Sequence, residues 1–232
     1  MSPQPQANKA PTELEAALEY ALLGIPVFPC NPLDKKPLTP RGFKDAAKDE
    51  AQIRAWWQKW PNAMIGAPTG PASGMWVVDL DLDPARRIDG KATLNQLIAQ
   101  RGPIPETLTT ITPRGGQHLI FSWDSNTEIR NSAGKIGPGV DVRGNGGYIC
   151  LPPSKSARGG EYRWVSNGVA QAVPAPSWLI TLAKGHEGQG VGEGRPGARM
   201  QNGRLRAARH PQHHAQYRRL QPVSDYCRRR AR

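Results

Sequence analysis

The chain has 232 residues, 38% of them hydrophobic, and a formal net charge of +12. A chain of this length can bury a sizeable core, in one compact unit or in two closely packed subdomains. It contains no apolar run long enough to span a membrane and no signal-peptide pattern at its N-terminus, so we expect no membrane attachment. The three cysteines, Cys30, Cys150 and Cys227, form no Cys-x-x-Cys pair. This spacing argues against a zinc ribbon and indicates a reduced, cytoplasmic protein.

The positive charge is unevenly distributed along the chain. Residues 1–184 contain 20 basic and 16 acidic residues, a net charge of +4, whereas residues 185–232 contain 11 arginines and 3 acidic residues, a net charge of +8. A strongly basic segment indicates a polyanionic partner such as nucleic acid. The tail has no sustained apolar period. We therefore predict either a disordered basic extension that holds nucleic acid through counterion release, or a segment translated in a non-native frame.

Local signals divide the preceding residues into helices and strands. Residues 1–11 are polar and proline-rich and are expected to be disordered, and Thr12 then fits the N-cap of the first helix. Tryptophans at helical spacing mark the second helix, where packing into the core is favoured over stacking on bases. We predict helices over residues 13–23, 49–59 and 93–100 (capped by Thr93) and one from Ser177, and strands over residues 25–30, 63–67, 75–82, 109–113, 117–121 and 162–165. Mostly antiparallel strands with helices on one face make an α+β arrangement.

An apolar run that ends in alternating aspartates, from Met75 to Asp83, is the most informative segment of the chain. Side chains alternate between the two faces of a strand, so Asp79, Asp81 and Asp83 point to one face and the apolar residues between them to the other. Carboxylates held this close raise each other's pKa unless a cation lies among them. Such oxygen ligands suit Mg²⁺ or Mn²⁺ rather than zinc. We therefore favour a metal-binding strand over a strand whose exposed face happens to be acidic.

A second informative segment is a predicted β-hairpin whose loop contains Arg114, Gly115 and Gly116. His118 lies just after this loop, with Leu119 and Phe121 on the opposite face from it. Glycines let backbone N–H groups approach a phosphate, and an arginine can donate two hydrogen bonds to its oxygens. The loop is therefore a candidate phosphate site, and the alternative for His118 is a structural hydrogen bond.

A third segment places Asn145-Gly146 between two alternating apolar runs, which is a strong signal for a hairpin. Asp141 and Arg143 share a face at the rim of this predicted hairpin. They are either a surface ion pair worth less than about 1 kcal/mol, or a further carboxylate for the metal site and a further arginine for the phosphate site.

In this order the three segments resemble the bifunctional primase/polymerase domain of the archaeo-eukaryotic primase superfamily, which is common in plasmid and phage replication proteins. The resemblance rests on Asp-x-Asp after a hydrophobic run, on Thr-Pro-x-Gly-Gly-x-His, and on Gly-x-Asp-x-Arg-Gly-x-Gly-Gly-Tyr followed by Pro-Pro-Ser. It extends upstream to Lys-x-Pro at residues 35–37 and covers residues 13–183. It implies an RRM-like, mostly antiparallel catalytic sheet with helices, packed with an N-terminal α/β unit, within a domain over residues 12–184.

The resemblance also implies roles for the matching positions. Asp79, Asp81 and Asp141 would be the catalytic, metal-binding carboxylates, and His118 would contact the triphosphate of the incoming nucleotide. From their positions alone we add three basic nucleotide contacts: Arg114, Arg143 and Lys36. The alternative for the loop that carries Lys36 is a solvated basic loop without a contact to the substrate.

Asp83 departs from the family pattern, which needs two acidic positions on this strand. The two acidic positions of the family could therefore correspond to Asp81 and Asp83 instead. We prefer Asp79 with Asp81, because the apolar run ends just before Asp79 and because a residue that precedes a proline, as Asp83 does, rarely continues regular pairing.

These residue types fit nucleotidyl transfer, which needs charge neutralisation and an in-line geometry rather than covalent help. Two cations roughly 3.5–4 Å apart can activate a primer 3′-hydroxyl and stabilise the leaving pyrophosphate. We therefore expect a DNA primase/polymerase of plasmid or phage replication that uses Mg²⁺ or Mn²⁺, a single-stranded DNA template and (deoxy)nucleoside triphosphates. The sequence has no P-loop motif, so a helicase would be a separate partner. The alternatives are a metal-dependent nuclease or phosphohydrolase, and a non-catalytic nucleic-acid-binding remnant.

Overall fold

The computed structural model describes residues 10–126, 128–165 and 171–185. Apart from residues 10, 11 and 185, the predictions for the N-terminal segment and the basic tail lie outside the described residues. The helices are α1 (Glu13–Leu22), α2 (Glu50–Lys59), α3 (Gly90–Arg101) and α4 (Ser177–Lys184), with the 3₁₀ helices η1 (Gly42–Asp45) and η2 (Pro84–Arg86). The strands are β1 (Phe28–Cys30), β2 (Met64–Pro68), β3 (Met75–Leu80), β4 (Leu82–Asp83), β5 (Ile88–Asp89), β6 (Leu108–Ile111), β7 (Gln117–Ser122), β8 (Ser132–Gly137), β9 (Val140–Arg143), β10 (Tyr148–Leu151) and β11 (Arg163–Trp164). None of the described helices is both long and apolar enough to cross a membrane.

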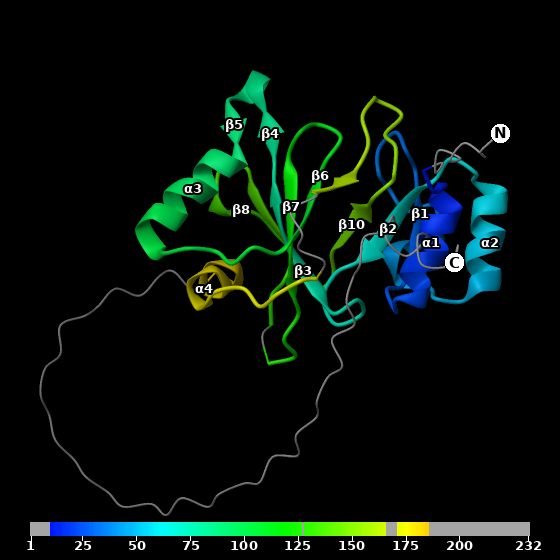
Figure 1. Ribbon diagram of the computed structural model, residues 1–232, viewed down its shortest axis with the longest axis horizontal. Helices are drawn as coiled ribbons and strands as arrows, with labels where there is room; N and C mark the ends of the chain where they lie inside the picture. The colour runs from blue at the N-terminus through cyan, green and yellow to red at the C-terminus, as the bar shows by residue number, and fades with distance from the viewer. Residues whose placement is uncertain (1–9, 127, 166–170, 186–232) are drawn as a thin grey trace, which may run out of the picture.

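The N-terminal part forms an α/β unit around a three-stranded antiparallel sheet with the order β1-β2-β10, beside which α1 and α2 lie (Figure 1). The start of α1 is confirmed, because the Thr12 hydroxyl accepts a hydrogen bond from the Glu15 N–H while the Glu15 carboxylate accepts one from the Thr12 N–H. Trp57 is buried in the core of this unit, and Trp56 and Trp60 pack against the same core. The tryptophans of α2 therefore have the core role that their spacing favoured.

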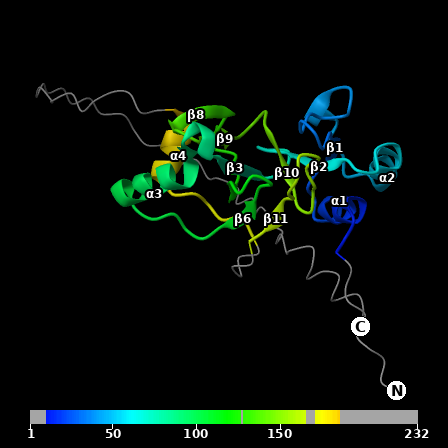
Figure 2. The ribbon, with the colours of Figure 1, turned by 90° about the horizontal axis from the view of Figure 1, so that it is seen from above.

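The second sheet has six strands, all antiparallel, with the order β11-β6-β7-β3-β9-β8. On one face, Trp76 and Val78 of β3 pack in a core that includes residues of α3 and α4. On the other face, Met75 and Val77 pack in the core of the N-terminal unit. Both views show α3 and α4 at one end of the molecule and α1 and α2 at the other (Figures 1 and 2). The predicted α+β class is confirmed.

The sequence predicts that buried and exposed residues alternate along this strand, but every residue of β3 is buried. The strand ends at Leu80, and Val77 is buried on the same face as Asp79. Asp81 therefore lies beyond the end of the strand, and Asp83 belongs to the small β4–β5 hairpin. A central strand of a sheet that is covered on both faces has no exposed face, so a carboxylate on it must be accommodated in a cavity.

The predicted hairpin around Asn145-Gly146 is wrong. β9 pairs with β3 and β8 in the large sheet, whereas β10 pairs with β2 in the N-terminal sheet, so the chain crosses here from one sheet to the other. A turn is present, since the Gly147 N–H donates to the Gly144 C=O, but Gly146 has a positive φ (87°) and Asn145 does not. The usual Asn-Gly hairpin turn needs a positive φ at both central residues. The Thr69 side chain and N–H hold the crossing by donating to the carbonyl groups of Gly144 and Gly147.

Two further predictions concern the elements around the site. The hairpin that carries His118 is confirmed, because β6 and β7 form an antiparallel pair. The start of α3 differs from the prediction: Asp89 is its N-cap and accepts a hydrogen bond from the Ala92 N–H, whereas Thr93 lies in the first turn and donates to the Pro138 C=O. Aspartate is as good a cap as threonine, so the helix begins directly where β5 ends.

Candidate active site

Four polar side chains form a row across the large sheet, on the neighbouring strands β6, β7, β3 and β9. Thr110 lies opposite His118, His118 lies opposite Asp79, and Asp79 lies opposite Asp141. Residues directly opposite each other in an antiparallel pair place their side chains on the same face. Val77, two residues before Asp79 on this face, belongs to the core between the two sheets. The polar row therefore marks the place where that core ends.

The guanidinium group of Arg143 joins the two carboxylates of the row. Its Nη2 lies 3.0 Å from Asp79 Oδ2 and 3.0 Å from Asp141 Oδ2, and its Nε lies 3.2 Å from Asp79 Oδ2. Asp141 Oδ1 accepts a further hydrogen bond from the Gly134 N–H at 2.9 Å. Burial alone would lower the pKa of Arg143, but Asp79 and Asp141 outweigh it and raise the pKa. Like charges directly opposite each other destabilise a sheet, and Arg143 supplies the positive charge that offsets this repulsion.

Asp81 supplies a third carboxylate just beyond β3. Its N–H donates to the Gly139 C=O and its C=O accepts from the Gly90 N–H, so its backbone remains fixed. Burial raises the pKa of Asp81, and the charges of Asp79 and Asp141 raise it further. The Asp81 side chain forms no hydrogen bond or ion pair with another described residue. Of the three carboxylates, it is the one most available to a new cation.

His118 is buried beside Asp79, with its Nε2 at 3.5 Å from Asp79 Oδ1. Its ring centroid lies 5.6 Å from that of Tyr162. Burial lowers the pKa of His118 and outweighs the opposing effect of Asp79, so the imidazole is neutral near neutral pH. Its Nδ1 is buried without a hydrogen-bond partner among the described residues. An unpaired buried ring nitrogen is costly, so a ligand atom or water that pairs with it would stabilise the site.

The lowered pKa of His118 predicts how stability changes with pH. The ordinary value is 6.5, so the unfolded chain binds the proton first as the pH falls, and the free energy of unfolding decreases below this pH. We expect this decrease, measured by chemical denaturation between about pH 7.5 and about pH 5.5, to be smaller in His118→Gln by up to about 1 kcal/mol. An equal pH dependence in the two proteins would show that His118 is not a buried neutral histidine.

The middle of the polar row, His118 and Asp79, lines a cavity of about 350 Å³ between the two sheets. Residues of β3 and β7 form one wall, and residues of β10 form the facing wall. Five of the residues predicted from the sequence line this cavity: Asp79, Asp81, His118, Arg114 and Arg143. Asp141 does not line the cavity and is connected to it through Arg143.

The structure distinguishes two neighbouring lysines. Lys36, the predicted nucleotide contact, lies outside the cavity: its Nζ is 3.3 Å from Asp34 Oδ2 and its side chain is 79% exposed. Lys35 lines the cavity instead, with its Nζ 5.4 Å from the ring centroid of Tyr162. The Lys-x-Pro pattern already contained Lys35 as its first residue. Tyr162 and Asn131 also line the cavity, and no phosphate- or metal-binding pattern in the sequence marked them.

A glycine sets the distance between the Arg114 loop and the end of β3. A Cβ atom on Gly116 would collide with the backbone carbonyl group of Leu80. A larger residue would therefore push the start of β7 away from β3, and His118 with it. Close packing is a sufficient physical reason for this glycine, besides any backbone contact with a phosphate.

The donor set suits a hard divalent cation. Asp79, Asp81 and Asp141 offer carboxylate oxygens, the ligands that Mg²⁺ and Mn²⁺ prefer. In the part of the chain that the structure describes, no group of three or more His, Cys, Asp or Glu side chains is already arranged to hold a metal ion. Arg143 engages one oxygen of Asp79 and one of Asp141. A cation therefore fits the chemistry of these carboxylates, provided that Arg143 releases an oxygen to it.

Comparison with known proteins identifies a family with this arrangement of motifs. A family model described as "Bifunctional DNA primase/polymerase, N-terminal" matches residues 17–178. The matched range contains the whole polar row and all residues that line the cavity. A search of curated proteins finds no match.

Proposed function

The chain belongs to the bifunctional DNA primase/polymerase family, whose model matches more than half of it, and on this premise we propose that it catalyses metal-dependent, template-directed nucleotidyl transfer. The observation that carries the proposal is the row of His118, Asp79 and Asp141 with Arg143 joined to both carboxylates. It gathers oxygen ligands for a cation and nitrogen donors for a phosphate beside one cavity. Plasmid or phage replication is the proposed setting, with single-stranded DNA as template and a separately made helicase as a candidate partner.

Mg²⁺ or Mn²⁺ held by Asp79, Asp81 and Asp141 would supply activation of the 3′-hydroxyl group and neutralisation of charge at the leaving pyrophosphate. The protein's own contribution begins with Asp81, whose pKa is raised by burial and by its acidic neighbours. A cation nearby favours its ionised form again. A bound cation would therefore oppose the upward shift of the Asp81 pKa.

His118 and the arginines would hold the phosphates of the nucleotide. A neutral His118 can donate one hydrogen bond to a phosphate oxygen without adding charge. Arg114 lines the cavity and can donate two hydrogen bonds to one phosphate. When a cation binds Asp79 and Asp141, Arg143 can leave these carboxylates and donate its hydrogen bonds to a phosphate instead. Arg143 would in this way link nucleotide binding to metal binding.

A primer-extension assay tests this function. The protein is incubated with a single-stranded template, a labelled primer, deoxynucleoside triphosphates and Mg²⁺ or Mn²⁺. We expect lengthening of the primer that follows the template and needs the divalent cation. Shortening of the primer would instead identify a nuclease. Metal-independent binding of DNA without any change in the primer would identify a non-catalytic remnant.

A further inference from the structure

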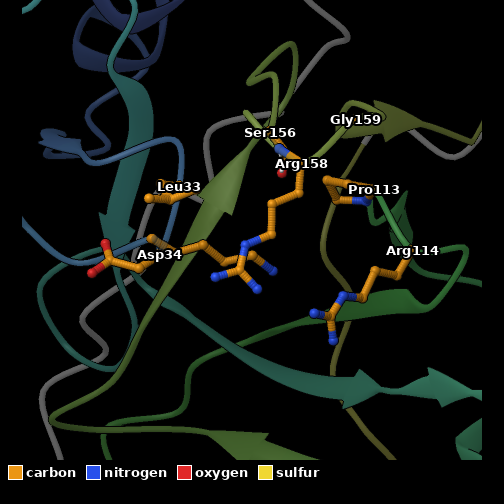
Figure 3. A pocket seen from close by; sticks show the side chains of 8 residues that line it. Leu33, Asp34, Pro113, Arg114, Ser156, Arg158 and Gly159 are labelled. Atoms are coloured by element: carbon orange, nitrogen blue, oxygen red, sulfur yellow. Dashed lines mark hydrogen bonds between the residues drawn. The ribbon is translucent and has the colours of Figure 1, made fainter.

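A second, larger pocket lies beside the cavity that His118 and Asp79 line (the catalytic cavity). It encloses about 550 Å³ and is formed by three loops: the one after β1, the one between β6 and β7, and the one between β10 and β11. Each loop contributes one basic residue: Lys35, Arg114 and Arg158. Figure 3 shows the side chains of Arg114 and Arg158 extending from different loops toward the same end of the pocket.

These three cations have no acidic partner among the described residues. All three residues are exposed, and none of them forms an ion pair with another described residue. Among the described residues, Asp34 is the one carboxylate that lines the pocket. It is occupied by Lys36, whose N–H donates to Asp34 Oδ1 at 3.1 Å and whose Nζ lies 3.3 Å from Asp34 Oδ2. The N–H of Lys36 and then its side chain lower the pKa of Asp34, so Lys36 neutralises this acid and leaves the pocket positive.

The backbone at Lys35 supports a role for its side chain. Lys35 has a φ of 64°, a conformation that glycine adopts without strain and that other residues seldom adopt. The loop imposes it, because the Lys35 N–H donates to the Asn31 C=O and the Asn31 N–H donates to the Lys36 C=O. The Tyr148 hydroxyl also donates to the Lys35 C=O, which fixes the loop to β10. Glycine at position 35 would relieve this strain, yet the residue is a lysine that lines a basic pocket. The strained backbone therefore indicates a function for the Lys35 ammonium group.

The pocket and the catalytic cavity are continuous, because Asp34, Lys35 and Arg114 line both. From this continuity, and resting on the proposed nucleotidyl transfer, we infer that the three-loop pocket binds the terminal phosphates of a nucleoside triphosphate through Lys35, Arg114 and Arg158. The same contacts hold the pyrophosphate that leaves after transfer.

Charge favours a polyphosphate over the backbone of a nucleic-acid strand. A phosphodiester group carries one negative charge, whereas a terminal phosphate alone carries about −1.5 to −2 at neutral pH. A strand presents one such charge per nucleotide, whereas a polyphosphate carries its charges on directly adjoining phosphates, which three converging cations match better. Leu33, 55% exposed, and Pro113 add an apolar rim to the pocket, which can contact the sugar or base of the same nucleotide.

Binding of inorganic pyrophosphate and tripolyphosphate to the full chain tests the inference without requiring catalysis. Isothermal titration in the absence of divalent cations compares the wild type with Lys35→Gly and Arg158→Ala. We expect each substitution to weaken binding about tenfold or more, the effect of losing one charge-assisted hydrogen bond. Lys35→Gly should keep the thermal midpoint of the wild type or exceed it, because glycine relieves the strained φ.

Two matched controls remove the same charge elsewhere. Arg87→Gly replaces the other described non-glycine residue with a positive φ (55°), outside both cavities. Lys155→Ala removes a cation from the same β10–β11 loop as Arg158 but outside the pocket. Both controls should bind pyrophosphate as the wild type does.

Activity assays then identify which nucleotide uses the pocket. A raised KM for deoxynucleoside triphosphate with a nearly unchanged kcat in primed extension would assign the pocket to the incoming nucleotide. Loss of unprimed synthesis with normal primed extension would assign it to the nucleotide that starts a chain. Both results support the inference. Unchanged pyrophosphate binding in Lys35→Gly and Arg158→Ala would overturn it, as would a loss confined to single-stranded DNA binding. Normal pyrophosphate binding by a wild type that extends no primer would refute the proposed function alone.

Discussion

Asp79→Asn is expected to lower the rate of nucleotide incorporation by roughly 10³-fold or more. Asp79 lies at the centre of the polar row, opposite both His118 and Asp141, and its two oxygens face His118 and Arg143. Asparagine keeps the shape of the side chain and can still pack beside these neighbours, but it removes the charge that would bind a divalent cation. The primer-extension rate, measured at saturating nucleotide, shows the effect directly.

Asp83→Asn is the matched control for this substitution. Asp83 lies four residues further along the chain, caps the start of η2 by accepting a hydrogen bond from the Arg86 N–H, and lines neither cavity. We expect its extension rate to remain within about twofold of the wild type, since surface substitutions away from a site have small effects. Substantial activity in a folded Asp79→Asn protein, or equal losses in both variants, would move the catalytic centre away from Asp79.

Arg143→Gln is expected to reduce both stability and activity, and to make the protein more responsive to divalent cations. Without the guanidinium group, the opposed carboxylates of Asp79 and Asp141 lose their counter-charge. Because the Arg143 side chain is 30% exposed, we expect the free energy of unfolding without metal to fall by about 1–3 kcal/mol, less than for a fully buried pair. Loss of a phosphate donor should slow primer extension by about 10²-fold.

Divalent cations distinguish this role of Arg143 from a purely structural one. Mg²⁺ or Mn²⁺ can occupy the position that the guanidinium group leaves, so each should raise the thermal midpoint of Arg143→Gln more than that of the wild type. Arg130→Gln is the control, because Arg130 pairs with Glu128 at an exposed position where a salt bridge contributes little. If divalent cations shifted the midpoints of Arg143→Gln and Arg130→Gln equally, Arg143 would not be the counter-ion of the carboxylates.

Several elements followed from local sequence because their determinants are local. The capping box of Thr12 and Glu15 starts α1 through hydrogen bonds within one turn. The loop with Gly115 and Gly116 joins the hairpin of β6 and β7, and this hairpin carries His118 to the site. The order of the motifs along the sequence was also enough to predict the family, and the family model confirms that prediction. The sequence favours Asp79 over Asp83 because the apolar run ends just before Asp79 and because a proline follows Asp83. Asp79 lines the cavity and Asp83 does not.

Long-range pairing decided the features that the sequence could not determine. The turn at Asn145-Gly146 looks like a hairpin locally, yet β10 pairs with β2, which lies about 80 residues earlier in the chain. That pairing closes the cavity between the two sheets, and no local pattern specifies it. Selection of Lys35 over Lys36 depends on a backbone conformation imposed by hydrogen bonds within a folded loop. The sequence by itself therefore determined which chemical groups this protein has, whereas the tertiary structure decided which of them share a cavity, because contacts between distant strands form only in the folded chain.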